Sequence, residues 1–208
     1  MSSVGSFCDF IQARDAAGLQ VFTTNERHLS VDHIERNNRA LFEACRDGDE
    51  EICEVLIRFG ADVNSAVCQR TPLFIACKNT HPACVDLLLS NGVKVNVVDF
   101  DGWTPLMATA NADDTPDGLT LDQFIDNRCR CMRSLLAAGA AIDQTDNNGW
   151  TRNSGTALMY ATWNFRLTEI LIEAGANLNI FNNDPESALH WACNRRGGGA
   201  ASGARGRH

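Results

Sequence analysis

One stretch, residues 71–96, sets a pattern that the rest of this chain repeats. It opens with Thr71-Pro72-Leu73, and proline is tolerated in the first turn of a helix because its missing N–H would be unpaired there anyway. A second apolar segment, 85–89, ends before Asn91-Gly92, where glycine readily adopts the left-handed conformation that terminates helices. The stretch therefore predicts two short helices joined as a hairpin. Two such helices cannot bury both apolar faces alone, so the pattern predicts copies stacked on either side.

The copies recur at a nearly constant spacing. Thr104-Pro105-Leu106 begins 33 residues after Thr71, and Arg39-Ala40-Leu41 begins 32 residues before it. A fourth copy opens at Thr156, and a fifth, which is cut off, opens at Ser187. A fixed period of this length is typical of stacked repeat architectures. The sequence therefore predicts copies that begin near 39, 71, 104, 156 and 187.

On these motifs and this period, residues 39–193 resemble ankyrin repeats. The resemblance implies an all-α fold, an ankyrin-type α-solenoid of helical-hairpin repeats, with short β-hairpin fingers projecting where the copies join. It also implies a non-catalytic protein–protein interaction module, a scaffold or adaptor that presents a concave surface of fingers and first helices. The alternative is a regulatory or substrate-targeting arm of a larger enzyme, a kinase or ubiquitin ligase, whose catalytic or recruiting part is absent from these residues.

Charge and hydropathy narrow the class of partner. Acidic residues outnumber basic ones, 26 against 18, and the net charge of −8 argues against a phosphate-binding surface, so no nucleic-acid partner is expected. No stretch approaches the roughly 18 apolar residues of a membrane-spanning helix, and residues 1–9 lack the basic start and apolar run of a signal peptide. We expect a protein partner with an acidic or mixed face, no membrane insertion, and a cytoplasmic or nuclear location.

Motifs of catalysis are absent from the sequence. It contains no Gly-rich phosphate loop of the Walker or Rossmann kind, no His-Glu-x-x-His helix and no Gly-x-Ser-x-Gly elbow. The five histidines are scattered, and His190 occupies a position where ankyrin repeats carry a structural histidine. The chain is therefore not predicted to be an enzyme, and no catalytic residue or cofactor is expected.

Nine cysteines raise the alternatives of disulfides or a metal site. Cys45, Cys77 and Cys193 share one repeat position, where other copies carry Ala110 or Thr162, so this position selects small packing residues. Cys129 and Cys131 are two residues apart on a predicted helix, which separates their side chains by about 200° and makes them unsuitable for one metal ion. The cysteines are predicted to be reduced, mostly buried thiols, and no metal is expected.

The third copy carries an insertion. Gly92 and Gly139 are 47 residues apart, 14 more than the period, which predicts an insertion at about 111–128 between its two helices. Thr120 with Gln123 forms a capping box, so the second helix is predicted to be lengthened and to run from about 120 to 138. The insertion is either a partner-specific lip or a tolerated surface insertion, because added loop residues destabilise a fold only slightly.

Both ends of the chain depart from the repeat pattern. Residues 1–38 are interpreted as a degenerate N-terminal capping segment, and a disordered leader is the alternative. Residues 194–208 contain five glycines and four arginines and no large apolar residue, which predicts a flexible tail. Because the fifth copy is cut off, the chain is expected to be a truncated product or part of a longer protein. A monomer is expected, and dimerisation through the uncapped C-terminal face is the alternative.

Partner-binding candidates come from the fingers and from the ends of the first helices. Trp103 and Trp150 are assigned to the same repeat position just before a helix, where tryptophan either packs on the next finger or anchors a partner. The five residues 151–155 are predicted to lengthen the second of these fingers. The full candidate set comprises Phe100, Asp101, Trp103, Trp150, Arg152, Asn153, Arg46, Asp47, Lys78, Asn79 and Asn111.

Three asparagines, Asn64, Asn96 and Asn179, occupy the hairpin position of the ankyrin motif, each eight residues after a leucine. This pattern is similar to that of substrates of the asparaginyl hydroxylase that acts on ankyrin proteins. The resemblance therefore implies possible hydroxylation sites. The structural alternative is that each side chain bonds the turn backbone, as asparagine commonly does in turns.

Overall fold

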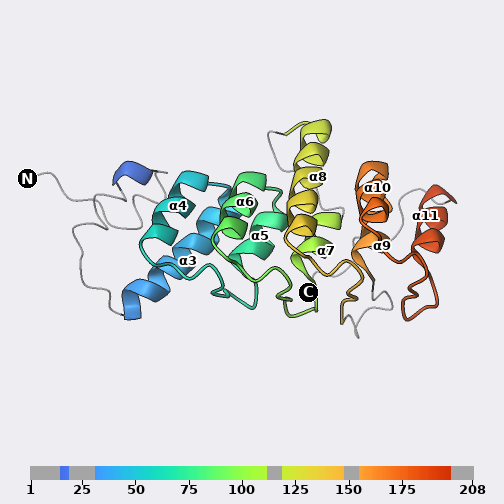
Figure 1. Ribbon diagram of the computed structural model, residues 1–208, viewed down its shortest axis with the longest axis horizontal. Coiled ribbons are helices and arrows are strands. Elements are labelled where there is room, and N and C mark those ends of the chain that lie inside the picture. Colours follow the sequence, from blue (N-terminus) through green and yellow to red (C-terminus); the bar gives the residue numbers. More distant parts are fainter. Residues whose placement is uncertain (1–14, 19–30, 112–118, 148–154, 198–208) are drawn as a thin grey trace, which may run out of the picture.

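The computed structural model describes residues 15–18, 31–111, 119–147 and 155–197. Figure 1 shows an elongated row of helices that runs from α3 to α11. Within the described residues, one helical turn at 16–18 precedes the following helices: α3 (Val31–Asp47), α4 (Glu50–Arg58), α5 (Pro72–Lys78), α6 (Pro82–Ser90), α7 (Pro105–Ala110), α8 (Leu121–Ala137), α9 (Ala157–Ala161), α10 (Phe165–Glu173) and α11 (Ala188–Gly197).

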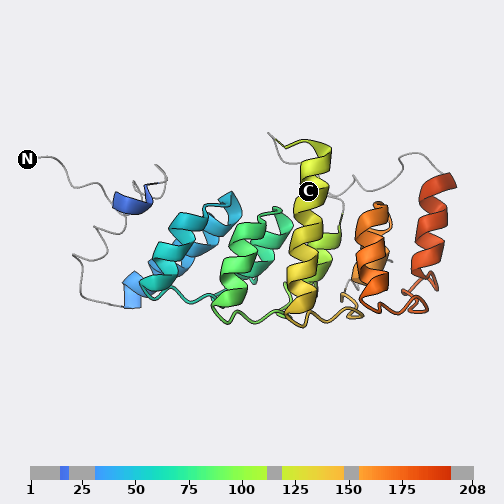
Figure 2. The same ribbon diagram turned by 45° about the horizontal axis from the view of Figure 1, so that its top comes forward.

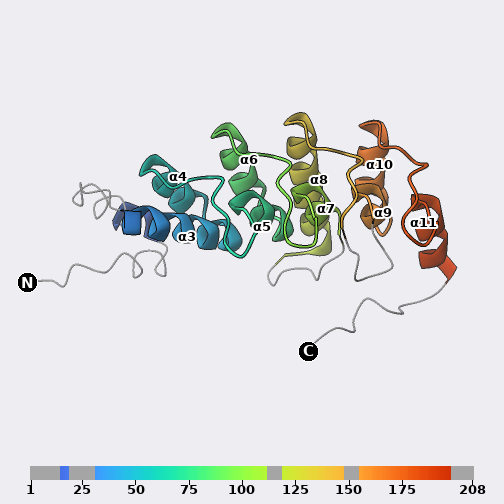
Figure 3. The same cartoon turned by 90° about the horizontal axis from the view of Figure 1, so that it is seen from below.

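The helices form two layers, which Figure 3 separates most clearly. The first helices of successive copies pack in the order α3, α5, α7, α9 and α11, and the second helices pack as α4, α6, α8 and α10. The connecting segments run along one edge of the row, below the helices in Figure 2. The core lies between the layers and includes fully buried leucines at 41, 56, 73 and 88. The expected all-α repeat fold is confirmed.

The threonine that precedes α5, α7 and α9 is explained by helix capping. The Oγ1 atoms of Thr71, Thr104 and Thr156 accept hydrogen bonds from the backbone N–H three residues later, at 3.2, 3.2 and 3.4 Å. A side-chain acceptor at this position satisfies one of the donors that a helix leaves unpaired at its N-terminus. Proline follows the cap in α5 and α7, as the sequence predicted. The repeated motif is therefore a start signal for the first helix.

The lengthened helix of the third copy agrees with the prediction of about 120–138. α8 spans Leu121–Ala137, and Thr120 and Gln123 form the expected capping box. The helix rises beyond its neighbours in Figure 1. Ion pairs connect it to both neighbours, since Arg130 contacts Asp86 of α6 at 2.7 Å and Asp126 contacts Arg166 of α10 at 2.6 Å. Residues 112–118, which belong to the predicted insertion, lie outside the described residues.

Two helix boundaries differ from the sequence interpretation. α3 begins at Val31, eight residues before the predicted start of the first copy, and α11 continues to Gly197, past the predicted start of the tail at 194. Neither added segment contains proline, and glycine appears only at 197, so nothing interrupts helical propagation. Of the predicted capping segment, Ala16 packs against the core beside the first copy.

The fourth copy should be less stable than the second. Ile172 and Leu178 of the fourth copy are about half exposed, whereas their counterparts Leu89 and Val95 are partly buried and pack against the core. Each repeat in such a stack is stabilised by its neighbours. We expect amides of residues 156–193 to exchange hydrogen faster than those of 71–96 in dilute, monomeric protein. Equal protection of the two segments would contradict this expectation.

Candidate partner-binding surface

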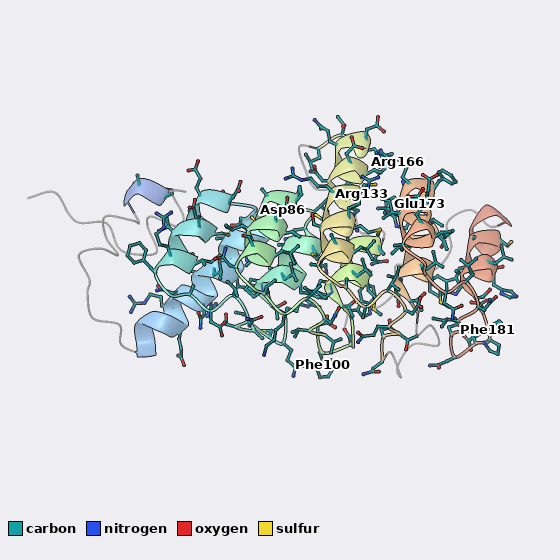
Figure 4. The ribbon with its side chains drawn as sticks, in the orientation of Figure 1. Asp86, Phe100, Arg133, Arg166, Glu173 and Phe181 are labelled. Atoms are coloured by element: carbon teal, nitrogen blue, oxygen red, sulfur yellow. The ribbon has the colours of Figure 1, made fainter. Side chains whose placement is uncertain are left out.

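The finger at residues 96–103 presents an exposed aromatic ring on a closely bonded turn. One carboxylate oxygen of Asp99 accepts hydrogen bonds from the backbone N–H groups of Asp101 and Trp103, both at 3.0 Å. The Asp99 N–H donates to the Trp103 carbonyl at 3.0 Å, and Gly102 takes the left-handed φ of 78° that the turn requires. Phe100 at the tip is 76% exposed and lies on the finger edge in Figure 4.

Neighbouring fingers hold this turn on both sides. Arg70, the last residue of the 65–70 finger, places its guanidinium 3.4 Å from the second carboxylate oxygen of Asp99. On the other side, the Asn147 N–H donates to the Asp101 carbonyl at 3.1 Å. Gly102 lies so close to Asn147 that a β-carbon there would come within 2.5 Å of the Asn147 nitrogen. The fingers therefore form a continuous edge, and Phe100 projects from it.

Three aromatic rings from successive copies pack together beside the fingers. The ring centroids of Trp103 and Tyr160 are 4.6 Å apart at an interplanar angle of 37°, and those of Tyr160 and Trp191 are 5.7 Å apart in an edge-on arrangement. Such offset and edge-on geometries are favourable between aromatic rings. Trp103 is half-buried in this row. Its position supports the packing alternative over a role as an exposed anchor.

The finger at residues 143–155 corrects one sequence assignment. Asp146 donates its N–H to the Gly155 carbonyl at 3.2 Å and accepts the Gly155 N–H on its side chain at 3.1 Å, the pairing that Asp99 makes with Trp103. Gly155, and not Trp150, therefore occupies the position of Trp103. The added residues therefore fall between Asp146 and Gly155 in sequence, and Trp150, Arg152 and Asn153 lie outside the described residues.

Tyr160 explains why glycine stands at position 155. The Tyr160 hydroxyl donates to the buried carboxylate of Asp146, which holds the ring against the closing pair of the finger. A β-carbon on Gly155 would lie 3.3 Å from the Tyr160 ring, tighter than ordinary contact. The ring of Tyr160 thus fills the space beside position 155. This buried tyrosine was not among the sequence candidates.

The candidates at the ends of the first helices differ in how exposed they are and in whether they bond within the fold. Arg46 and Asp47 are exposed and pair with each other at 2.9 Å. Asn79 is half-buried and donates to the Arg46 carbonyl at 2.8 Å, while the Asn111 carbonyl accepts from a buried arginine at 2.5 Å. Lys78 is half-buried. The two asparagines thus contribute to contacts within the fold, and the charged pair remains accessible.

A ladder of hydrogen bonds joins successive copies and involves two of the three asparagines proposed for hydroxylation. The side-chain oxygens of Asn64 and Asn96 accept from the backbone N–H of Lys94 and Ala141, at 2.7 and 2.8 Å. Equivalent bonds run from Asp62 N to Asn38 and from Asn177 N to Asp143. These contacts support the structural alternative for Asn64 and Asn96. Hydroxylation stays a prediction, and peptide mass spectra of the native protein without oxidation at Asn64, Asn96 and Asn179 would remove it.

Arg128 is a structural residue that the sequence reasoning missed. Arg128 belongs to α8, and its side chain is fully buried. One terminal nitrogen lies 3.3, 2.6 and 2.5 Å from the carbonyl oxygens of Ala108, Thr109 and Asn111. These carbonyls lie at the C-terminal end of α7, where a helix leaves acceptors unpaired and favours positive charge. The guanidinium also lies 4.5 Å from the centre of the Phe124 ring. Arg128 therefore links the lengthened helix to the first helix of its copy.

Six of the described cysteines are buried: Cys45, Cys53, Cys77, Cys84, Cys129 and Cys131. The sulfur atoms of Cys45 and Cys53 are 3.5 Å apart. Burial raises the pKa of Cys131 to about 12, and the hydrogen bond with Cys45 followed by burial raises the pKa of Cys53. Such thiols are poor nucleophiles. In the described part of the chain, no group of three or more His, Cys, Asp or Glu residues has the arrangement of a metal site. No helix there is long and apolar enough to cross a membrane.

Comparison with known proteins agrees with the repeat geometry. A family model described as "Ankyrin repeats (3 copies)" matches residues 22–99 and 41–116. The chain is 28% identical over 190 residues to the putative ankyrin repeat protein FPV244 of fowlpox virus, covering 91% of this chain and 25% of the relative. It is 33% identical over 110 residues to glycerophosphocholine phosphodiesterase gde1 of Schizosaccharomyces pombe, covering 51% of this chain and 8% of the relative.

A third relative is the mouse ankyrin repeat and SOCS box protein 16, which is 45% identical over 51 residues, 24% of this chain and 11% of the relative. The chain thus spans a quarter or less of the length of these three proteins. The chain belongs to the ankyrin repeat proteins.

Proposed function

We propose that this chain is a scaffold or adaptor that binds a protein partner, without catalysis, along its finger edge and the adjoining first helices. Ankyrin repeats are generally protein–protein interaction modules. The observation that carries the proposal is the position of Phe100. A 76% exposed ring on a turn held by Asp99 and by both neighbouring fingers is unfavourable in water, yet it is already ordered for binding. Aromatic anchors of this kind often dominate interface energetics.

The charge of the finger segments favours a basic partner surface. Among the described residues of the finger segments, the carboxylates of Asp62, Asp101, Asp143 and Asp184 are exposed. The basic groups there are the exposed Lys94 ammonium and the partly exposed Arg70 guanidinium, which already pairs with Asp99. This pattern disfavours the acidic partner face expected from the sequence and favours Arg- or Lys-containing segments next to an apolar group that contacts Phe100. Electrostatic attraction between exposed charges is screened by salt. We therefore expect partner binding to weaken as ionic strength rises.

Phe100→Ala should reduce partner capture about tenfold or more without unfolding the protein, because the removed ring contacts solvent in the free chain. Phe165→Ala is a matched control, since Phe165 is 77% exposed at the start of α10, outside the finger segments. Quantitative mass spectrometry of proteins captured by each variant provides the measurement. Equal partner recovery with Phe100→Ala and wild type would contradict the proposed surface.

The second candidate is an interaction arm of a larger enzyme or ubiquitin ligase. Its support comes from relatives whose names include a phosphodiesterase and a SOCS box protein, each far longer than the segment matched by this chain. Sequencing the 3′ end of the native transcript distinguishes the two candidates. A catalytic domain or a ligase-recruiting box in the continuing reading frame would favour the second candidate.

A further inference from the structure

Two fingers close their turns with the same aspartate but bond its second oxygen to different groups. One carboxylate oxygen of Asp99 and of Asp146 accepts the backbone N–H of the residue that closes the finger, at 3.0 and 3.1 Å. The second oxygen of Asp146 accepts the hydroxyl of Tyr160, which belongs to its own copy. The second oxygen of Asp99 lies 3.4 Å from the Nε of Arg70, which belongs to the neighbouring finger. The turn that carries Phe100 is therefore joined to another finger by a side chain.

Arg70 reaches this aspartate from an ordered backbone position. Arg70 and Val67 pair across their finger, with N–H to carbonyl distances of 2.9 and 3.1 Å. The next residue, Thr71, caps α5. The guanidinium carbon of Arg70 lies 5.5 Å from the centre of the Phe74 ring, a distance at which a cation is attracted to an aromatic face. The side chain is thus supported by α5 on one side and contacts the next finger at its end.

The aspartate at the other end of this contact is shielded from water. The Asp99 side chain is 4% exposed, whereas that of Arg70 is 41% exposed. A buried carboxylate that loses its cation is destabilised, because water does not replace the lost partner without a rearrangement. Salt also screens a buried pair less than an exposed one. Removal of the guanidinium should therefore disturb the turn that Asp99 closes.

We infer that Arg70 is a positioning residue for Phe100: through Asp99, its guanidinium fixes the turn that presents the ring to a partner. This inference rests on the proposed binding at the finger edge. On the other side of Phe100, the Asp101 carbonyl accepts the Asn147 N–H at 3.1 Å. That second link is between backbone groups, so Arg70 is the link that a substitution can remove. A turn that is ordered before binding loses less entropy on binding, which raises affinity.

A direct effect of the Arg70 charge on binding would have the opposite sign. The described finger segments expose more carboxylates than basic groups, and the proposed partner surface is basic. Removal of a guanidinium from such an edge would strengthen the attraction of a basic partner. Loss of the positioning contact weakens binding instead. The direction of the change on substitution of Arg70 therefore separates the two roles.

Hydrogen exchange of the whole chain without a partner, followed by NMR, measures the hold on the turn. The amides of Asp101 and Trp103 donate to Asp99, so they report on its order. Arg70→Ala should make these two amides exchange about threefold faster or more, and Arg70→Lys, which keeps a cation, should give rates closer to wild type. Arg58→Ala is the matched control, because Arg58 is exposed and forms its ion pair within α4. It should leave both amides unchanged.

Crosslinking measures the consequence for binding. A photoreactive phenylalanine analogue replaces Phe100 in chains that contain Arg70, Arg70→Ala or Arg58→Ala. We expect Arg70→Ala to lower the yield of crosslinked partner about threefold or more, and Arg58→Ala, which removes the same charge far from the turn in sequence, to leave the yield unchanged.

Three results would overturn the role of Arg70. They are unchanged exchange of Asp101 and Trp103 in Arg70→Ala, exchange in Arg70→Lys as fast as in Arg70→Ala, and crosslinking that stays equal or increases in Arg70→Ala. The absence of any crosslink from position 100 in the chain that keeps Arg70 would contradict the proposed function itself. The exchange comparison needs no partner, so it decides separately whether Arg70 holds the turn.

Discussion

Replacing Arg128 by alanine should lower the free energy of unfolding by about 3 to 4 kcal/mol, because the change removes charged hydrogen bonds to buried carbonyls and leaves a cavity. The guanidinium bonds the carbonyls of Ala108, Thr109 and Asn111, which belong to the end of α7 and its cap. Urea unfolding followed by far-UV circular dichroism measures the change.

Two further variants separate the causes of this loss. Arg128→Met keeps most of the volume but none of the hydrogen bonds, so it should still lower stability by about 2 kcal/mol. Arg130→Ala is the control, because Arg130 is exposed and forms a surface ion pair with Asp86, which predicts a loss of about 0.5 kcal/mol or less. Wild-type stability in Arg128→Met would show that the side chain acts by filling space alone.

Replacing Tyr160 by alanine should lower the free energy of unfolding by about 3 to 5 kcal/mol. The change removes a buried ring that contacts Trp103 and Trp191 and a hydroxyl that bonds Asp146. Tyr160→Phe keeps the ring contacts and should lose about 1.5 to 3 kcal/mol, the contribution of a hydrogen bond to a charged group. The measurement is again urea unfolding, followed by tryptophan fluorescence to report on the aromatic row.

A double-mutant cycle between Trp103→Ala and Tyr160→Ala provides the control. The two residues should show a coupling energy of about 0.5 to 1.5 kcal/mol if their rings interact as the geometry indicates. Additive losses would mean that Trp103 stabilises the fold independently of Tyr160. That result would reopen the interpretation of Trp103 as a residue available to a partner.

The fold could be predicted because its signals are local and repeated. Thr71-Pro72 and Thr104-Pro105 contain both the capping acceptor and the residue suited to the first helical turn, so the starts of α5 and α7 are encoded in adjacent residues. The capping box at Thr120 likewise placed the start of α8 within one residue. Such motifs need no knowledge of distant contacts, which explains the agreement.

The candidate surface was harder to predict because it depends on contacts between copies. Arg128 lies four residues after Phe124 and four before Met132, which places it on the buried face of α8. A search for apolar residues at helical spacing passes over a charged residue at such a position. The position of Gly155 in the repeat depends on its pairing with Asp146. The Gly-Trp sequence at 149–150 resembles Gly102-Trp103, and for that reason Trp150 was assigned to the position that Gly155 occupies. A polar residue within an apolar periodicity is the sequence signal that would have identified Arg128.

Site-specific photo-crosslinking tests the central claim, that the finger edge binds a protein partner, most directly. A photoreactive phenylalanine analogue replaces Phe100 in one variant and Phe165 in the other, two positions that are 76 and 77% exposed. After irradiation of the native cells, we expect position 100 to crosslink to a defined partner protein and position 165 not to do so. Crosslinking of that partner from position 165 alone, or the absence of any crosslink from position 100, would contradict binding at the finger edge.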